Sequence, residues 1–361
     1  MATDPTGSAQ GSERSVKSHA GTDEGTDEGK DEGRKLDNPA IAEAARALAA
    51  GELVAFPTET VYGLGARADD TQAVARIFSA KGRPADHPLI VHVASMAAAE
   101  SFAASLSVEA RCLMQSCWPG PVTVIVPRRS GMARAAAAGQ ASIGLRMPAH
   151  PVALALLRQA ADLGVAGVAA PSANRFGRVS PTTAEHVRQE FGQTLRVLEG
   201  GGSEIGIESA IVDCTQSSPA LLRPGQLSAA HLARLLGRPL ALPSADSPRV
   251  SGTLASHYAP DAPVVLWTAA ALWDALQAGP GRAPAGLAVY SRSLDGAALA
   301  RLGQGKLVLR RMPDNADQAA HELFGVLREL DAAGVSSIWI ELPPPHPEWD
   351  GVRDRLTRAA A

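Results

Sequence analysis

The stretch 54–66 changes sharply from apolar residues to polar residues and glycine. Leu53–Phe56 predicts a short buried strand, and Pro57 ends its pairing because proline has no N–H to donate. Thr60 is one of the polar residues that follow. Open α/β sheets bind ligands at the carboxyl ends of their strands. We therefore expect part of a binding site here, although an ordinary strand–loop connection would use the same residue types.

Two cations follow in the sequence Lys81-Gly82-Arg83-Pro84. The pattern predicts a helix that ends at Gly82, and a lysine in the last turn of a helix is favoured by the helix dipole alone. That explanation does not cover Arg83, whose direction is restrained between glycine and proline. A lysine and an arginine that converge on one pocket suit a triphosphate, one as a point charge and the other as a planar fork.

Further polar residues stand where predicted strands end. Arg146 closes the predicted strand 143–146, where it could form a surface ion pair or hold a carboxylate with two hydrogen bonds. Ser172 and Asn174 offer a hydroxyl and an amide just after the predicted strand 165–170. These three side chains are candidates for contacts with a polar ligand.

His87 and His92 bracket another predicted strand, although a single histidine is more often structural than functional. Ser180 precedes a predicted helix in which Thr182 is the cap and Glu185 completes a capping box. No G-x-x-x-x-G-K-[ST] occurs, and no G-x-G-x-x-G follows a strand. Nucleotide binding therefore cannot be argued from the standard motifs.

The C-terminal third of the chain has its own pattern. Residues 239–256 are rich in proline, serine and alanine and read as a linker. Strands and helices then alternate, which predicts a small parallel-sheet domain. The predicted strands there are Val264–Trp267, Leu287–Tyr290, Leu307–Leu309 and Ser337–Leu342, and the predicted helices include Ala270–Leu276, Asp317–Ala333 and Gly351–Ala360.

The 361 residues suggest two domains, and the net charge is −3. Residues 1–36 are polar and acidic, which predicts a disordered tail. The rest of the chain is neutral, so it lacks the basic character of a strong nucleic-acid binder. No apolar run approaches the roughly 20 residues that span a bilayer, and the N-terminus is unlike a secretory signal. Three cysteines without zinc-type spacing argue for reduced thiols in a cytosol.

These motifs, in this order, resemble the YrdC-like family of threonylcarbamoyl-AMP synthases, in its long two-domain form. The resemblance covers residues 37–361. It rests on the stretch 54–66 and on Lys81–Pro84, His87–Val93, Trp118–Thr123, Ile143–Pro148, Ala170–Asn174, Ile207–Asp213, Leu222–Gly225 and His257–Pro260. It implies an α/β fold: a YrdC-like twisted mixed sheet with flanking helices at 37–238, a linker or lid at 239–261, and a smaller Rossmann-like α/β domain at 262–361.

The resemblance also implies a reaction. L-threonine, bicarbonate and ATP would give threonylcarbamoyl-AMP and diphosphate, with Mg²⁺ bound to ATP and no metal held by the protein alone. The product would pass to a tRNA-modifying transferase complex that forms N6-threonylcarbamoyladenosine. A cytoplasmic location, no membrane association and weak contact with double-stranded RNA would accompany this role.

The family's site residues fall on matching positions. Lys81 and Arg83 would be catalytic and would also hold ATP. The threonine and bicarbonate site would comprise Thr60, His92, Arg146 and Ser209, and the other ATP contacts would be His87, Ser172, Asn174, Ser180, Arg223 and Tyr258. The linker sequence Val250–Leu254 departs from the Ser-Pro-Gly-Met run of relatives, so its position over the pocket is open.

Two other functions fit parts of the sequence. A carbamoyl-adenylate-forming enzyme of hydrogenase maturation has a related domain, but it also carries acylphosphatase and zinc-finger segments that this chain lacks. A non-catalytic RNA-binding module is a second alternative, and the neutral charge and the scarcity of aromatic residues count against it.

Overall fold

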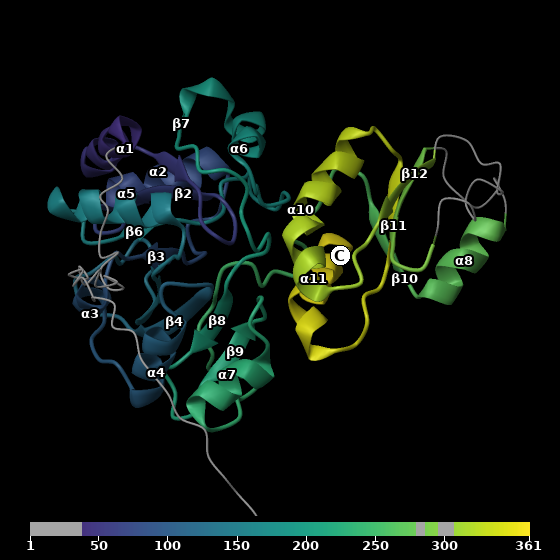
Figure 1. Ribbon diagram of the computed structural model, residues 1–361. Coiled ribbons are helices and arrows are strands. Elements are labelled where there is room, and N and C mark those ends of the chain that lie inside the picture. Colours follow the sequence, from purple (N-terminus) through teal and green to yellow (C-terminus); the bar gives the residue numbers. More distant parts are fainter. Residues whose placement is uncertain (1–37, 279–285, 295–306) are drawn as a thin grey trace, which may run out of the picture. The chain divides into compact units, whose positions relative to one another are not determined.

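The computed structural model describes residues 38–278, 286–294 and 307–361 (Figure 1). The predicted disordered tail, residues 1–36, lies outside the described residues. Residues Leu36–Ala361 form one compact unit, which contains two separate β-sheets.

The larger sheet has nine strands in the order β7-β1-β2-β6-β3-β5-β4-β8-β9. Parallel and antiparallel pairs both occur in it, which confirms the predicted mixed sheet. The strands are β1 (Val54–Phe56), β2 (Gly63–Arg67), β3 (Ile90–His92), β4 (Val122–Pro127), β5 (Ser142–Arg146), β6 (Val168–Ala169), β7 (Arg196–Val197), β8 (Ala210–Asp213) and β9 (Ala220–Arg223).

Strand β2 was not predicted, because its two glycines suggested a loop. The structure explains them by close packing. A Cβ atom on Gly65 would lie 2.8 Å from the Phe56 ring and 2.8 Å from Val168 Cγ1. The strand therefore needs glycine at this position to lie between its neighbours.

Helices cover both faces of the larger sheet (Figure 1). Val54 and Phe56 pack in the cluster formed with α1 and α5, whereas Ala55, between them, packs in the cluster that includes α2 and α4. This alternation is the strand period of two. The helices are α1 (Pro39–Ala49), α2 (Thr71–Lys81), α3 (Met96–Phe102), α4 (Val108–Cys117), α5 (Pro151–Asp162), α6 (Ala184–Phe191) and α7 (Ala229–Leu236).

The ends of two helices test predictions from the sequence. Lys81 is the last residue of α2, and Gly82 ends the helix with a φ of 64°, as predicted. The predicted capping box before α6 is wrong. Thr183 is the N-cap of α6, because its side chain accepts a hydrogen bond from the backbone N–H of His186. Thr182 therefore precedes the cap, and Glu185 stands too near the cap to complete a box with it.

The smaller sheet consists of four parallel strands in the order β10-β13-β11-β12, which confirms the predicted parallel α/β arrangement. Helices α10 and α11 cover one face and α8 covers the other (Figure 1). The elements are β10 (Val264–Trp267), α8 (Ala269–Gln277), β11 (Leu287–Ser291), β12 (Leu307–Arg311), α10 (Ala316–Ala332), β13 (Ser337–Glu341) and α11 (Asp350–Ala359).

Glu341, at the end of β13, is 2% exposed and holds the loop that follows β11. Its Oε2 accepts hydrogen bonds from the hydroxyls of Ser291 and Ser293, and from the backbone N–H groups of Arg292 and Ser293. Burial raises the pKa of Glu341, but the bonds from Ser291 and Ser293 outweigh it and hold this pKa below its ordinary value. The ionised carboxylate therefore stabilises the folded state.

We expect Glu341→Gln to lower the free energy of unfolding by about 2 kcal/mol at pH 7, the usual size of a lost hydrogen bond to a charged group. Because the folded pKa of this carboxyl lies below the unfolded one, the stabilisation is present at neutral pH and is lost as pH falls through the folded pKa. The difference between wild type and variant should therefore shrink below about pH 4. Denaturant unfolding across that range measures it, and the exposed Glu348→Gln should change little at any pH. An equal difference at pH 7 and pH 3 would contradict the assignment.

The parts of this unit that carry the two sheets share one buried cluster. Val61, Ile207 and Tyr258 pack with Phe324 of α10 and Leu356 of α11. No helix in the described part of the chain is long and apolar enough to cross a membrane. The three cysteines form no disulfide.

Candidate active site

A cavity of about 40 Å³ collects most of the predicted site residues. The strands of the larger sheet position them: His92 ends β3, Arg146 ends β5, Arg223 ends β9 and Ser209 directly precedes β8. The predicted residues that line the cavity are Thr60, His92, Arg146, Ser172, Ser209, Arg223 and Tyr258. Residues from distant parts of the sequence thus meet at strand ends, as the first stretch of polar residues suggested.

Parallel pairing of β3 and β5 sets His92 directly opposite Arg146. Arg146 is 3% exposed, so it does not form the surface ion pair considered from the sequence. Its guanidinium donates to Glu59 Oε1 at 2.7 Å, to Thr60 Oγ1 at 2.9 Å and to the Gly120 carbonyl at 3.2 Å. A guanidinium has five N–H groups, so this buried pair leaves donors for a ligand.

His92 is neutral at physiological pH. Burial, followed by the positive charge of Arg146, lowers the pKa of His92 to about 3. Its Nδ1 is buried and has no hydrogen-bond partner. The imidazole can therefore serve a ligand as a neutral hydrogen-bonding group, and it adds no charge beside Arg146.

Three other buried cations surround the cavity. Lys81 Nζ donates to the carbonyls of Ser172 (2.6 Å) and Asn174, and burial lowers the pKa of Lys81 well below its ordinary value. Arg83 donates to the Pro88 carbonyl at 3.1 Å. Arg223 donates to the Ser209 carbonyl at 2.9 Å and to Ser209 Oγ at 3.2 Å. In the described part of the chain, none of these three cations forms an ion pair with a carboxylate.

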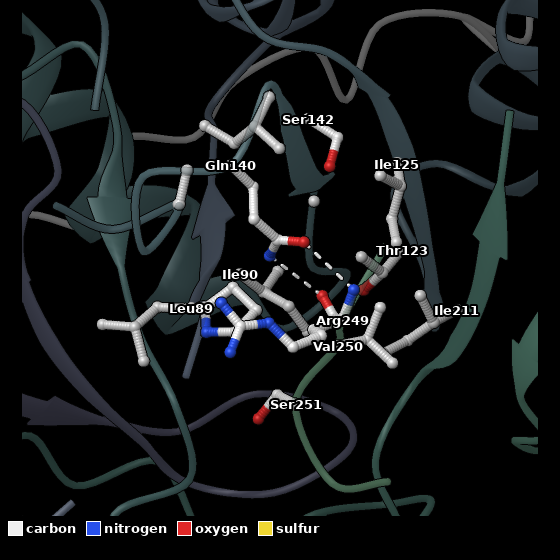
Figure 2. A pocket seen from close by; sticks show the side chains of 14 residues that line it. Leu89, Ile90, Thr123, Ile125, Gln140, Ser142, Ile211, Arg249, Val250 and Ser251 are labelled. Atoms are coloured by element: carbon white, nitrogen blue, oxygen red, sulfur yellow. Dashed lines mark hydrogen bonds between the residues drawn. The ribbon is translucent and has the colours of Figure 1, made fainter. Parts of the chain in front are cut away.

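The linker lies over this site. Ser251 Oγ accepts from Arg83 at 3.3 Å, and the Ser251 carbonyl accepts from Arg223 at 2.9 Å. Figure 2 shows how Arg249, two residues before Ser251, is held: the Gln140 side-chain amide accepts from the Arg249 backbone N–H at 3.0 Å and donates to the Arg249 carbonyl at 3.1 Å. Arg249, Val250 and Ser251 also line a second, mostly apolar cavity of about 20 Å³ (Figure 2).

Five predicted residues lie outside the cavity lining. Lys81 and Arg83 reach it through their contacts with Ser172 and Ser251, described above. Asn174 donates to the carbonyls of Arg175 and Arg178, and Ser180 Oγ donates to Glu208 Oε1 at 2.5 Å.

His87 is the most peripheral of the predicted residues. Its ring packs edge-on against Phe176, with centroids 5.5 Å apart, and Phe176 packs in the same way against His257. Burial lowers the pKa of His87, as does the nearby Arg83. His87 is thus linked through the Phe176 ring to His257, which lines the cavity.

Several lining or supporting residues were missed from the sequence. Glu59 pairs with Arg146, Glu208 and His257 line the cavity, and Thr123 Oγ1 lies 2.8 Å from Ser209 Oγ. Glu59, Glu208 and His257 stand directly beside predicted residues, and that adjacency was an available signal. Thr123 is the second residue of β4, and nothing in its sequence position pointed to Ser209.

Buried polar atoms without a partner gather around the cavity. Beside His92 Nδ1 they are Glu59 Oε2, Arg83 Nε, Asn174 Oδ1, His257 Nδ1 and Tyr258 Oη. Buried polar groups in folded proteins nearly always have partners, so this concentration marks a place where a polar ligand would supply them. In the described residues, no group of three or more His, Cys, Asp or Glu side chains could hold a metal ion.

Comparisons with known proteins match both parts of the chain. Residues 46–225 match a family model described as "Telomere recombination", which covers Sua5, YciO and YrdC proteins, and residues 225–361 match "Threonylcarbamoyl-AMP synthase, C-terminal domain". The threonylcarbamoyl-AMP synthase of Pyrococcus abyssi is 38% identical over 82% of this chain and 87% of its own length. That of Schizosaccharomyces pombe is 32% identical over 85% of each chain.

A crystal structure of Pyrococcus abyssi Sua5 complexed with L-threonine matches this chain with a TM-score of 0.80. The match is 35% identical and covers 89% of this chain and 94% of the other. The similarity to these synthases over most of both chains identifies a nucleotidyltransferase-type enzyme. The chain belongs to the threonylcarbamoyl-AMP synthase family.

Proposed function

We propose that this enzyme joins L-threonine, bicarbonate and ATP into threonylcarbamoyl-AMP and releases diphosphate. The observation that carries the proposal is the set of three buried cations, Lys81, Arg83 and Arg223, with no carboxylate partner in the described residues. Burying a charge without an opposite charge is costly, and burial accordingly lowers the pKa of each of these three side chains. A polyphosphate that enters the site would neutralise all three, as MgATP would.

The amino-acid part of the proposal rests on the neighbouring residues. We propose that Arg146 holds the carboxylate of L-threonine, using N–H groups that its bonds to Glu59 and Thr60 leave free. Thr60, Ser209 and neutral His92 would contact the rest of the amino acid and bicarbonate. The Pyrococcus abyssi Sua5 structure is a complex with L-threonine, which supports this assignment.

Both nucleophiles of this reaction come from the substrates. Bicarbonate yields CO2 and hydroxide. The amine of threonine captures this CO2 as a carbamate, and the proton that the amine loses combines with the hydroxide as water. A carbamate oxygen then attacks the α-phosphorus of ATP, with diphosphate as the leaving group. The protein therefore has to hold the reactants together, neutralise the phosphates through its cations and exclude water from the intermediates. Ser172, Asn174, Ser180, His87 and Tyr258 complete the proposed ATP site.

The linker must move for this reaction to start. Pockets that hold small-molecule ligands usually measure about 300–1,000 Å³, whereas this cavity measures about 40 Å³. Ser251 takes up hydrogen bonds from Arg83 and Arg223 that the proposal gives to phosphates. We therefore propose that the segment around Ser251 is a lid, which withdraws to admit ATP and returns to shield the adenylate.

Diphosphate release tests the proposed reaction. The full chain is assayed with MgATP, L-threonine and bicarbonate, and again with each omitted in turn. We expect release only with all three, and the new adenylate identified by mass. Release that requires a preformed carbamoyl donor in place of threonine and bicarbonate would instead indicate the carbamoyl-adenylate-forming alternative, and RNA binding without any release would favour the non-catalytic module.

We propose further that the adenylate feeds N6-threonylcarbamoyladenosine formation by a tRNA-modifying transferase complex in the cytoplasm. The three unpaired cysteines support a reducing compartment. Contact with double-stranded RNA, if it accompanies this transfer, would be weak because the chain outside its N-terminal tail is neutral.

A further inference from the structure

Arg355 of α11 is a charged side chain that the proposed reaction does not use, yet it is 0% exposed. Its Nε donates to Glu208 Oε2 at 2.9 Å, and its two Nη groups donate to the carbonyls of Glu208 (3.0 Å) and Pro224 (2.8 Å). Its remaining hydrogen-bond partner is the adjacent Asp354, at 2.9 Å. A guanidinium from the small-sheet part of the chain thus reaches two segments of the larger-sheet part.

These two segments carry proposed substrate contacts. Glu208 directly precedes Ser209, and Pro224 directly follows Arg223. Ser209 and Arg223 are themselves joined by hydrogen bonds. One side chain therefore fixes both segments at their point of contact, with a rigid fork that a lysine could not reproduce.

Arg355 also determines which partner the Glu208 carboxylate has. Oε2 of Glu208 is taken by Arg355 and Oε1 by Ser180, so the carboxylate forms no ion pair with the nearby Arg223. Burial raises the pKa of Glu208, but Arg355 and then Arg223 outweigh it, so the group stays ionised. Arg223 is left without a carboxylate and remains available to an anion.

The third link is to Tyr258, which lines the cavity. Arg355 Cζ lies 5.6 Å from the centroid of the Tyr258 ring, within cation–π range. The first turn of α11 packs closely against the backbone at Gly225, because a Cβ atom on Gly351 would lie 2.7 Å from the Gly225 carbonyl oxygen. The arrangement is therefore closely packed around the guanidinium.

We propose that Arg355 is a positioning residue for the nucleotide site, holding Ser209, Arg223 and Tyr258 in place and keeping Glu208 from pairing with Arg223. This inference rests on the proposed function, and it assigns to the C-terminal part of the chain a direct share in the geometry of the site.

The test uses full-length protein and the diphosphate-release assay. Arg355→Met keeps a long side chain without the charge, and we expect kcat/KM for ATP to fall about 100-fold, as for other displaced catalytic groups, with a raised KM. In Arg355→Met the Glu208 carboxylate loses its partner and can pair with Arg223. Adding Glu208→Gln to this variant removes that carboxylate. The double variant should recover the KM for ATP by on the order of tenfold, a typical coupling between residues in contact.

Two controls separate positioning from stability. Arg178, in the larger-sheet part of the chain, forms ion pairs with Asp261 and Asp331, which lie toward the small-sheet part. Arg178→Met removes these ion pairs. We expect it to lower the melting temperature and to leave the KM for ATP unchanged. Arg355→Lys keeps a positive charge beside Glu208 and is therefore the variant less prone to misfold. It lacks the planar guanidinium that binds two segments at once, so its KM for ATP should lie between those of wild type and Arg355→Met.

A normal KM and kcat for folded Arg355→Lys and Arg355→Met would overturn the inference, and so would a double variant with no recovery. Either result would leave Arg355 as a structural residue only. Failure of the proposed function has a different signature, because wild type itself would then release no diphosphate in response to threonine and bicarbonate.

Discussion

Replacing Arg83 by alanine should slow threonine-dependent diphosphate release by about 100-fold or more, the loss seen when a donor that stabilises transition-state charge is removed. Arg83 is 6% exposed, and its Nε has no partner. Burial, aided by the nearby Arg223, lowers the pKa of Arg83 to about 10, so it stays charged at neutral pH. Its protein partners are a carbonyl and a hydroxyl, both weaker acceptors than a phosphate.

The measurement is steady-state diphosphate release at saturating threonine and bicarbonate, with ATP varied. Arg111→Ala is the matched control, since Arg111 is 49% exposed and pairs with Glu100 away from the cavity, and its rate should stay close to wild type. The melting temperature of Arg83→Ala should not fall steeply, because no carboxylate loses its partner. A near-normal rate for Arg83→Ala would remove it from the ATP site.

Valine should be rejected by about 10⁴-fold in kcat/KM relative to threonine, because a site built to bind a substrate hydroxyl leaves buried polar groups unpaired when that hydroxyl is missing. Buried hydroxyls are concentrated around Thr60 and Ser209, the residues proposed to contact the amino acid. Thr58 Oγ1 lies 2.8 Å from Thr60 Oγ1, which also accepts from Arg146, and Ser209 Oγ lies 2.8 Å from Thr123 Oγ1.

Serine provides the complementary comparison, since it keeps the hydroxyl and lacks only one methyl group. We expect serine to be poorer than threonine by about tenfold, the usual value of one methyl contact. Competition assays with each amino acid under identical ATP and bicarbonate measure both ratios. Comparable rates with valine and threonine would show that the amino-acid pocket has been placed wrongly.

Local patterns were sufficient for much of the fold. The apolar run before Pro57 predicted β1, and Lys81-Gly82 predicted the end of α2. The alternation after residue 262 predicted the parallel sheet that the structure contains. These features depend on neighbouring residues, so their physical causes are visible in a short window. The capping box predicted at Thr182 was wrong, because two adjacent threonines could each serve as the cap and Thr183 occupies that position.

The site was predictable in its residue types and strand-end positions, since seven of the residues implied by the family resemblance line one cavity. Their individual roles remain predictions. Tertiary structure alone decided which charges are paired: Arg146 with Glu59, and Arg355 with Glu208 across 147 positions of sequence. It also made glycine necessary in β2, where Phe56 and Val168 leave no space for a side chain. Ion pairing and close packing depend on distances in space between residues far apart in the sequence, and the fold alone sets those distances.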